Sequence, residues 1–231
     1  MKFIGSRGES VLAAKKSDEG RKYRMTDAAA IMNKMIHIKD ELDHHLPKKE
    51  SDVLWKKAGE KLDQMLKQYA SIPKEYRIHT DSRIFPAASV YLTLKEHLGK
   101  DEAYRMVEEP ILKRAESIGK KLAVLMRIPG VPGLFVKMWD PLTRKLFGEK
   151  NGFQNVFYPK QKDEFRMDII SCPYVRYFKE LGCPELTKIY CTCDDKVYGR
   201  LPGLRFQRNE TIGRGGKAVI SASEGSEDDR I

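Results

Sequence analysis

The feature that most constrains the fold is the spacing of apolar residues between positions 26 and 148, where they recur every three and four residues. That spacing places apolar side chains on one face of a helix, and it is sustained in five successive segments. Prolines and glycines separate the segments, which is typical of helix ends. The fourth segment contains Pro110, where a kink is expected. The predicted helices cover residues 26–46, 51–72, 81–98, 101–127 and 134–147.

The pattern changes after Gly148, where β-branched and aromatic residues gather in short segments typical of strands. The predicted strands are residues 155–158, 165–170 and 204–207, and short helices are expected over residues 172–181 and 184–194. We therefore predict an α+β fold, in which a helical N-terminal layer packs on a small C-terminal α+β lobe with a short antiparallel sheet.

The length of 231 residues is enough for one domain with a buried core. We predict a single domain over residues 26–218, helical in 26–148 and α+β in 149–218. A mobile lead-in rich in Lys, Arg, Gly and Ser is expected before it, over residues 1–25. Residues 219–231 are expected to form a polar tail.

The net charge of +10 is spread along the helical segments, where basic residues alternate with acidic ones. No nucleic-acid-binding motif occurs, so we expect solvated helix faces with an attraction for small anions, and no nucleic-acid partner. The longest membrane-like stretch is residues 128–136, far short of the roughly 20 apolar residues that span a bilayer. With no secretory signal visible, we expect a cytoplasmic protein with reduced thiols and no membrane partner.

All four cysteines fall in the C-terminal lobe, at Cys172, Cys183, Cys191 and Cys193. Their spacing lacks the C-x2-C pairs that are typical of structural zinc sites, and no histidine has a convincing partner in sequence. We therefore expect no metal and no other cofactor.

Cys172 is the first candidate catalytic residue. It follows Ser171, a good N-cap, and precedes Pro173, which favours the first turn of a helix. The free N–H groups of a helix N-terminus lower the pKa of a thiol, and a thiolate is a nucleophile. The alternative is a small buried residue that packs the lobe.

Cys191 and Asp194 are the other candidate catalytic residues. A spacing of three places them on one helix face, which alone is weak evidence for a shared site. Asp194 is a candidate general base for water, or a partner for an amino group of the substrate. Cys183 and Cys193 are interpreted as incidental.

Arg208 is the candidate substrate-binding residue, because a guanidinium clamps a carboxylate through two hydrogen bonds. The hydroxyl of Thr211 and the N–H groups of Gly215 and Gly216 would assist it. An ion pair with an acidic neighbour is the alternative. Arg83 and Tyr91 form a weaker pair, interpreted mainly as helix-packing residues.

The order of these residues resembles the L-2-amino-thiazoline-4-carboxylic acid hydrolase family. The resemblance covers roughly residues 26–218, and its specific part is the last 47 of them. The matching segments are Ser171-Cys172-Pro173-Tyr174, residues 178–186, Cys191-Thr192-Cys193-Asp194, residues 206–216 and residues 83–96.

The resemblance implies a hydrolase that adds water across the C=N bond of a small cyclic amidine-like substrate. The ring opens to an N-carbamoyl amino acid such as N-carbamoyl-cysteine. A small molecule is thus the expected partner, and a homo-oligomer is left open.

The chain departs from the family pattern after Gly216, where a Cys-Asp-Phe strand would follow. Here the sequence continues Lys217-Ala218 and then Val-Ile-Ser, which does not resemble a strand. The bases TGT-GAT-TTC encode Cys-Asp-Phe, and loss of the first T gives GTG-ATT-TC, which reads Val-Ile-Ser. We hypothesise that residues 219–231 are a frame-shifted tail.

Two alternatives to the hydrolase stay open. The altered C-terminus favours a catalytically impaired member that binds or senses a small molecule. The other alternative is a nucleic-acid or partner-binding protein that uses the basic body of the chain, whose binding would weaken steeply with salt.

Overall fold

A computed structural model describes residues 25–159, 164–208 and 218–224. The lead-in over residues 1–24 and the last part of the predicted tail, residues 225–231, lie outside these ranges. Among the helices within them, none combines the length and the apolar character needed to cross a bilayer.

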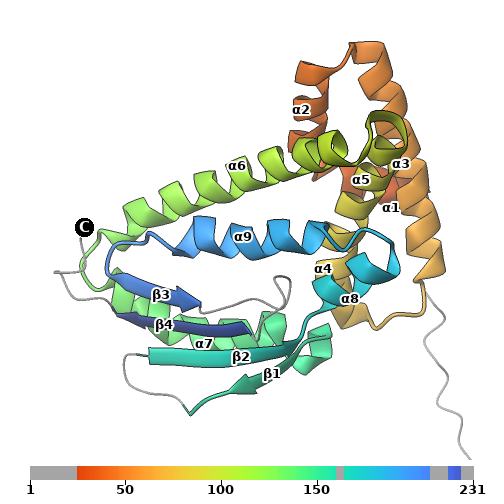
Figure 1. Ribbon diagram of the computed structural model, residues 1–231. Coiled ribbons are helices and arrows are strands. Elements are labelled where there is room, and N and C mark those ends of the chain that lie inside the picture. The colour runs from red at the N-terminus through yellow and green to blue at the C-terminus, as the bar shows by residue number, and fades with distance from the viewer. Residues whose placement is uncertain (1–24, 160–163, 209–217, 225–231) are drawn as a thin grey trace, which may run out of the picture.

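The N-terminal part is a layer of helices that share one buried core (Figure 1). Its principal helices are α1 (Met25–Asn33), α2 (Ile36–His45), α3 (Lys48–Gln68), α5 (Phe85–Leu98) and α6 (Lys100–Met126). The first predicted helix is therefore two helices, and α6 continues through Pro110 as one helix. The apolar residues that predict α3 are buried: Leu54, Ala58, Leu62, Met65 and Leu66.

The C-terminal lobe holds a four-stranded antiparallel sheet with strand order β1-β2-β4-β3. The strands are β1 (Gln154–Phe157), β2 (Glu164–Ser171), β3 (Leu204–Arg208) and β4 (Ala218–Glu224). Two helices connect β2 to β3: α8 (Pro173–Glu180) and α9 (Leu186–Tyr198). The α+β class, the three predicted strands and the two predicted short helices are confirmed.

Strand β4 corrects the prediction that the chain beyond Ala218 does not form a strand. Residues 218–224 lie between β2 and β3, and their backbone pairs with both neighbours. A strand with hydrogen-bonded neighbours on both sides is stabilised by backbone pairing, so apolar alternation is a weak guide to it. The frame-shift hypothesis concerns the gene and stays a prediction.

Helix α7 (Val131–Phe147) lies against β2 and β4 (Figure 1). The spacing of Leu134, Met138 and Leu142 predicts this helix, but each of these side chains is more than half exposed. The helix packs on the sheet through Trp139, which joins a cluster of apolar residues from β1, β2 and β3. A large aromatic ring buries more apolar surface than a leucine, so it determines which face of the helix turns inward.

Helix α9 packs along α6, and Gly119 of α6 marks a very close approach of the two backbones. A Cβ atom on Gly119 would lie 2.5 Å from the carbonyl oxygen of Lys196 and 3.2 Å from the Cα atom of Val197. Only glycine allows backbones to approach this closely. Gly119 therefore fixes the position of α9, the helix that carries Cys191 and Asp194.

The Gly119→Ala substitution is expected to lower the free energy of unfolding by about 1–3 kcal/mol, because α9 must move away from α6. Urea denaturation followed by circular dichroism would measure this. Gly59→Ala is the matched control, because its nearest non-local atom, Met32 Cγ, lies 4.0 Å from the added Cβ. That change is expected to be neutral or stabilising. Equal effects of the two substitutions would contradict the prediction.

The chain enters α5 through a π-helical turn at Thr80–Ile84, which follows the short helix α4 (Arg77–His79). Pro86 lies in the first turn of α5, as predicted, and has no N–H to donate to the carbonyl group of Ser82 four residues earlier. The wider π turn accommodates this interruption, and such turns are frequent at functional sites. The π turn lies against α8 and carries Arg83.

Candidate functional site

Cys172 lies where β2 ends and α8 begins. Ser171 is the last residue of β2, so Cys172 itself is the N-cap residue, and Pro173 is in the first turn of α8 as predicted. The sequence interpretation of Ser171 as the N-cap is wrong by one residue. The strand continues through Ser171 because Ser171 pairs with Gln154 of β1.

Burial raises the pKa of the Cys172 thiol to about 12, because a thiolate there would lose its hydration. The backbone N–H groups of Val175 and Tyr174 act in the opposite direction but do not compensate. The helix N-terminus thus acts in the predicted direction, but burial outweighs it and favours a neutral thiol, and the catalytic role of Cys172 stays a prediction. Electrostatic interactions with Cys191 and Asp194 also raise the pKa of this thiol.

Arg208, at the end of β3, joins the strand to α9. Its guanidinium donates to Asp194 Oδ2 at 3.1 Å and to the carbonyl oxygen of Cys191 at 2.6 Å, and it also donates to Asp195. The side chain of Arg208 is 5% exposed. Its hydrogen-bond donors therefore hold the face of α9 on which Cys191 and Asp194 lie.

Burial raises the pKa of Asp194 to about 6, although the charges of Arg208 and Arg83 lower it. The side chain nevertheless keeps 45% of its surface exposed. The Asp194 side chain is thus packed against protein but still in contact with solvent. A carboxylate with a pKa near neutrality is suited to accept a proton from water.

Arg83 also belongs to this site, although its sequence context gave it little weight. Its backbone carbonyl accepts a hydrogen bond from the Tyr190 hydroxyl of α9 at 3.0 Å. Its guanidinium interacts with the Tyr174 hydroxyl, and both Tyr174 and Asp194 raise its pKa. Tyr174 and Tyr190 carry no site role in the sequence analysis. The signal that could have found Tyr174 is its place beside Cys172 in the first matching segment.

Tyr174 is in turn held by His79, which is buried in α4. His79 Nε2 donates to the carbonyl oxygen of Leu146 at 2.8 Å, and His79 Nδ1 lies 3.1 Å from the Tyr174 hydroxyl. Because burial lowers the pKa of His79, the ring is neutral and Nδ1 accepts the hydroxyl proton. No sequence pattern indicated this contact.

The other predicted substrate-binding residues, Thr211, Gly215 and Gly216, lie outside the described residues. Cys183 is fully buried in the main core, and Tyr91 donates a hydrogen bond to Glu185.

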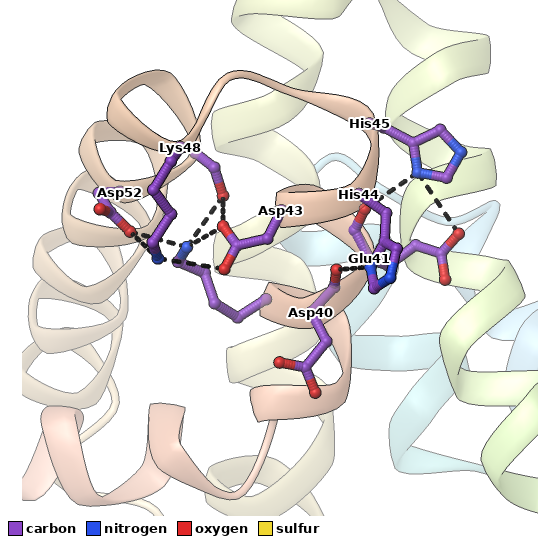
Figure 2. Close-up of polar contacts among 9 residues, drawn as sticks. Asp40, Glu41, Asp43, His44, His45, Lys48 and Asp52 are labelled. Carbon is purple, nitrogen blue, oxygen red and sulfur yellow. Dashed lines mark hydrogen bonds and ion pairs between the residues drawn. The ribbon is translucent and has the colours of Figure 1, made fainter.

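A second polar cluster, at the corner between α2 and α3, is separate from this site (Figure 2). The buried amine of Lys39 lies 2.8 Å from Asp52 and also contacts Asp43, and Lys48 bridges the same two carboxylates. All its charges are paired, so the cluster joins the two helices. His44 and His45, which Figure 2 shows beside it, bond to backbone carbonyl oxygens one turn earlier.

No group of three or more His, Cys, Asp or Glu side chains in the described part of the chain is arranged to hold a metal ion. The site instead combines a neutral thiol, a carboxylate with a pKa near 6 and two arginines on a small α+β scaffold. Titratable groups whose pKa values are shifted by burial and by specific charged neighbours are typical of functional sites.

A model of the L-2-amino-thiazoline-4-carboxylic acid hydrolase family matches residues 77–218, well over half of the chain. The chain therefore belongs to this family. The matched region contains Arg83, Cys172, Asp194 and Arg208. Searches of curated proteins and of solved structures found no significant match.

Proposed function

We propose that this protein is a hydrolase of the L-2-amino-thiazoline-4-carboxylate type, which opens a small cyclic amidine-like ring with water. The product from the thiazoline is N-carbamoyl-cysteine. One observation carries the proposal: the Asp194 carboxylate, with a pKa raised to about 6, is held on α9 by a hydrogen bond from Arg208. Family membership supports the class of reaction.

In the proposed step, Asp194 accepts a proton from water while the water oxygen bonds to the ring carbon between nitrogen and sulfur. The C=N double bond of the cationic amidine becomes single, and its electron pair moves to the ring nitrogen, which already carries a proton. The carbon–sulfur bond then breaks with its electron pair on sulfur, the hydroxyl group loses its proton to solvent and becomes a carbonyl, and the departing sulfur takes the proton from Asp194. One water is consumed and one free thiol is released. The carboxylates of Asp194 and Asp195 also suit a cationic amidine group, because they offer oxygen acceptors and negative charge.

Water is the proposed nucleophile, because Cys172 is a neutral thiol at neutral pH. The thiolate of Cys172 is the competing nucleophile. A cationic ring bound next to the sulfur would lower the pKa of the thiol. The contribution of Cys172 to catalysis is therefore tested by substitution.

The test is to incubate the purified protein with L-2-amino-thiazoline-4-carboxylate and to follow N-carbamoyl-cysteine by mass spectrometry. Appearance of the product with many turnovers per protein molecule supports the proposal. Absence of product, together with a rise in melting temperature on adding the thiazoline, would replace it with binding without turnover. The Val-Ile-Ser sequence at residues 219–221, in place of the Cys-Asp-Phe pattern, is the observation that favours this second candidate.

The Cys172→Ala substitution is expected to lower kcat by less than about tenfold, whereas loss of a covalent nucleophile costs several orders of magnitude. The measurement is steady-state release of N-carbamoyl-cysteine. Cys193→Ala is the control, because it removes another partly buried thiol of the lobe. A loss of activity beyond a thousandfold that is confined to Cys172→Ala would make Cys172 the nucleophile.

A further inference from the structure

The two arginines of the site differ in what their guanidinium groups contact. Arg208 is almost fully buried, and its N–H groups are used by Asp194, Asp195 and the Cys191 carbonyl oxygen. From the sequence, Arg208 is open to two interpretations, a clamp for a substrate carboxylate or an ion pair with an acidic neighbour. In the folded chain two carboxylates of the protein already occupy that clamp.

Arg83, by contrast, is an exposed residue, although protein surrounds much of its guanidinium group. No ion-pair partner for its guanidinium is found among the described carboxylates. Asp194 lies beyond ion-pair distance, although each group affects the pKa of the other. Arg83 therefore offers a positive charge that the described carboxylates do not neutralise.

The guanidinium of Arg83 is nevertheless held in place. Because the Tyr174 hydroxyl donates its proton to His79 Nδ1, its oxygen lone pairs are left for the N–H groups of Arg83. The Tyr190 hydroxyl holds the backbone carbonyl of Arg83 at the π turn. Preorganisation of this kind lowers the entropy cost of binding an anion.

We propose that Arg83 binds the carboxylate of the substrate, while Asp194 faces the cationic amidine group at the other end of the ring. The site then selects small zwitterionic ring compounds in which a carboxylate and an amidine are separated by the ring. Arg208 is a positioning residue, which acts through Asp194. This assignment rests on the proposed function for the substrate, but it can be tested by binding alone.

The kinetic test compares L-2-amino-thiazoline-4-carboxylate with 2-amino-2-thiazoline, which has the same ring without the carboxylate. Arg83→Gln is expected to raise the KM for the carboxylate substrate by about 10- to 100-fold, the usual range for a hydrogen-bonded charge pair. It should leave kcat/KM for 2-amino-2-thiazoline within about threefold of the wild type. Arg83→Lys keeps the charge but not the forked pair of N–H donors, so its KM for the carboxylate substrate should lie between those of the wild type and Arg83→Gln.

The binding test uses L-thiazolidine-4-carboxylate, which has the carboxylate but no amidine. It should raise the melting temperature of the wild type and not that of Arg83→Gln. Arg105→Gln is the matched control, because Arg105 lies on α6 in ion pairs with Glu102 and Glu109, and it should respond as the wild type does.

The results of the two tests separate the proposal that the protein is a hydrolase from the proposal that Arg83 binds the carboxylate. Stabilisation of the wild type but not of Arg83→Gln, without turnover of the thiazoline, would support Arg83 as the anion site and overturn the hydrolase. An unchanged KM and an unchanged melting shift in Arg83→Gln would overturn the assignment of Arg83. The same would follow if Arg83→Gln affected both thiazolines equally.

Discussion

Replacing Asp194 with Asn is expected to lower kcat/KM for thiazoline ring opening by a factor of about 10²–10⁴, the usual contribution of a general base. Asn has nearly the same shape but cannot accept a proton from water. The fold should persist, because Arg208 keeps its contacts with Asp195 and with the Cys191 carbonyl oxygen. Circular dichroism would check the fold, and product release would measure the rate.

The pH dependence of the wild type tests the same role. Asp194 acts as a base only when it is ionised, and its pKa is raised to about 6. Activity should therefore be constant above pH 7 and should fall about tenfold for each pH unit well below 6. An acid limb near pH 4, or an unchanged rate in Asp194→Asn, would exclude Asp194 as the base.

The second large effect is expected from Arg208→Gln. The charge of Arg208 and its hydrogen bond lower the pKa of Asp194, so their loss should raise that pKa further. An arginine next to a carboxylate typically shifts its pKa by about one to three units. The acid limb of kcat/KM should therefore move upward by about one unit or more, and less of the enzyme will be active at pH 7.

Arg208→Gln should also reduce stability, because it removes a buried cation that contacts both Asp194 and Asp195. A lower melting temperature alone would fit any structural role, so the pH profile is the decisive readout. A lower melting temperature with an unmoved acid limb would contradict the positioning role.

Asp195→Asn is the matched control for that profile, since it changes the same ion-pair cluster in the opposite electrostatic sense. The charge of Asp195 raises the pKa of Asp194, so its removal should move the acid limb below pH 6. Opposite shifts in the two variants are expected. Shifts in the same direction would show that Asp194 does not define the limb.

Much of the fold could be predicted because its signals are local. The spacing of apolar residues gave α3 and α6, and the positions of Pro173 and Gly99 marked helix ends that the structure retains. Strand β4 could not be predicted in this way, because its stability comes from neighbours distant in the sequence. For α7 the helix was predictable, whereas its buried face depended on the sheet it meets.

The candidate site, too, could be predicted from the sequence only in part. The sequence placed Cys191 and Asp194 on one helix face, and the structure has them on α9 with Arg208 bonded to that face. The role of Arg83 could not be assessed from the sequence, because its contacts with Tyr174 and Tyr190 depend on how the π turn meets α8 and α9. The partners of Arg208 could not be predicted either, because its guanidinium could bind a substrate carboxylate or an acidic neighbour in the protein.

The sequence by itself determined where helices begin and end, which residues share a helix face and which family the residue order resembles. These properties depend on hydrogen bonds and side-chain spacing within a few residues. Only the tertiary structure decided that β4 completes the sheet, that Arg208 pairs with two carboxylates while Arg83 has no ion-pair partner among the described ones, and that burial raises the pKa values of Cys172 and Asp194. The physical reason is that desolvation and charge pairing depend on every element packed around a group, and those elements come from distant parts of the chain.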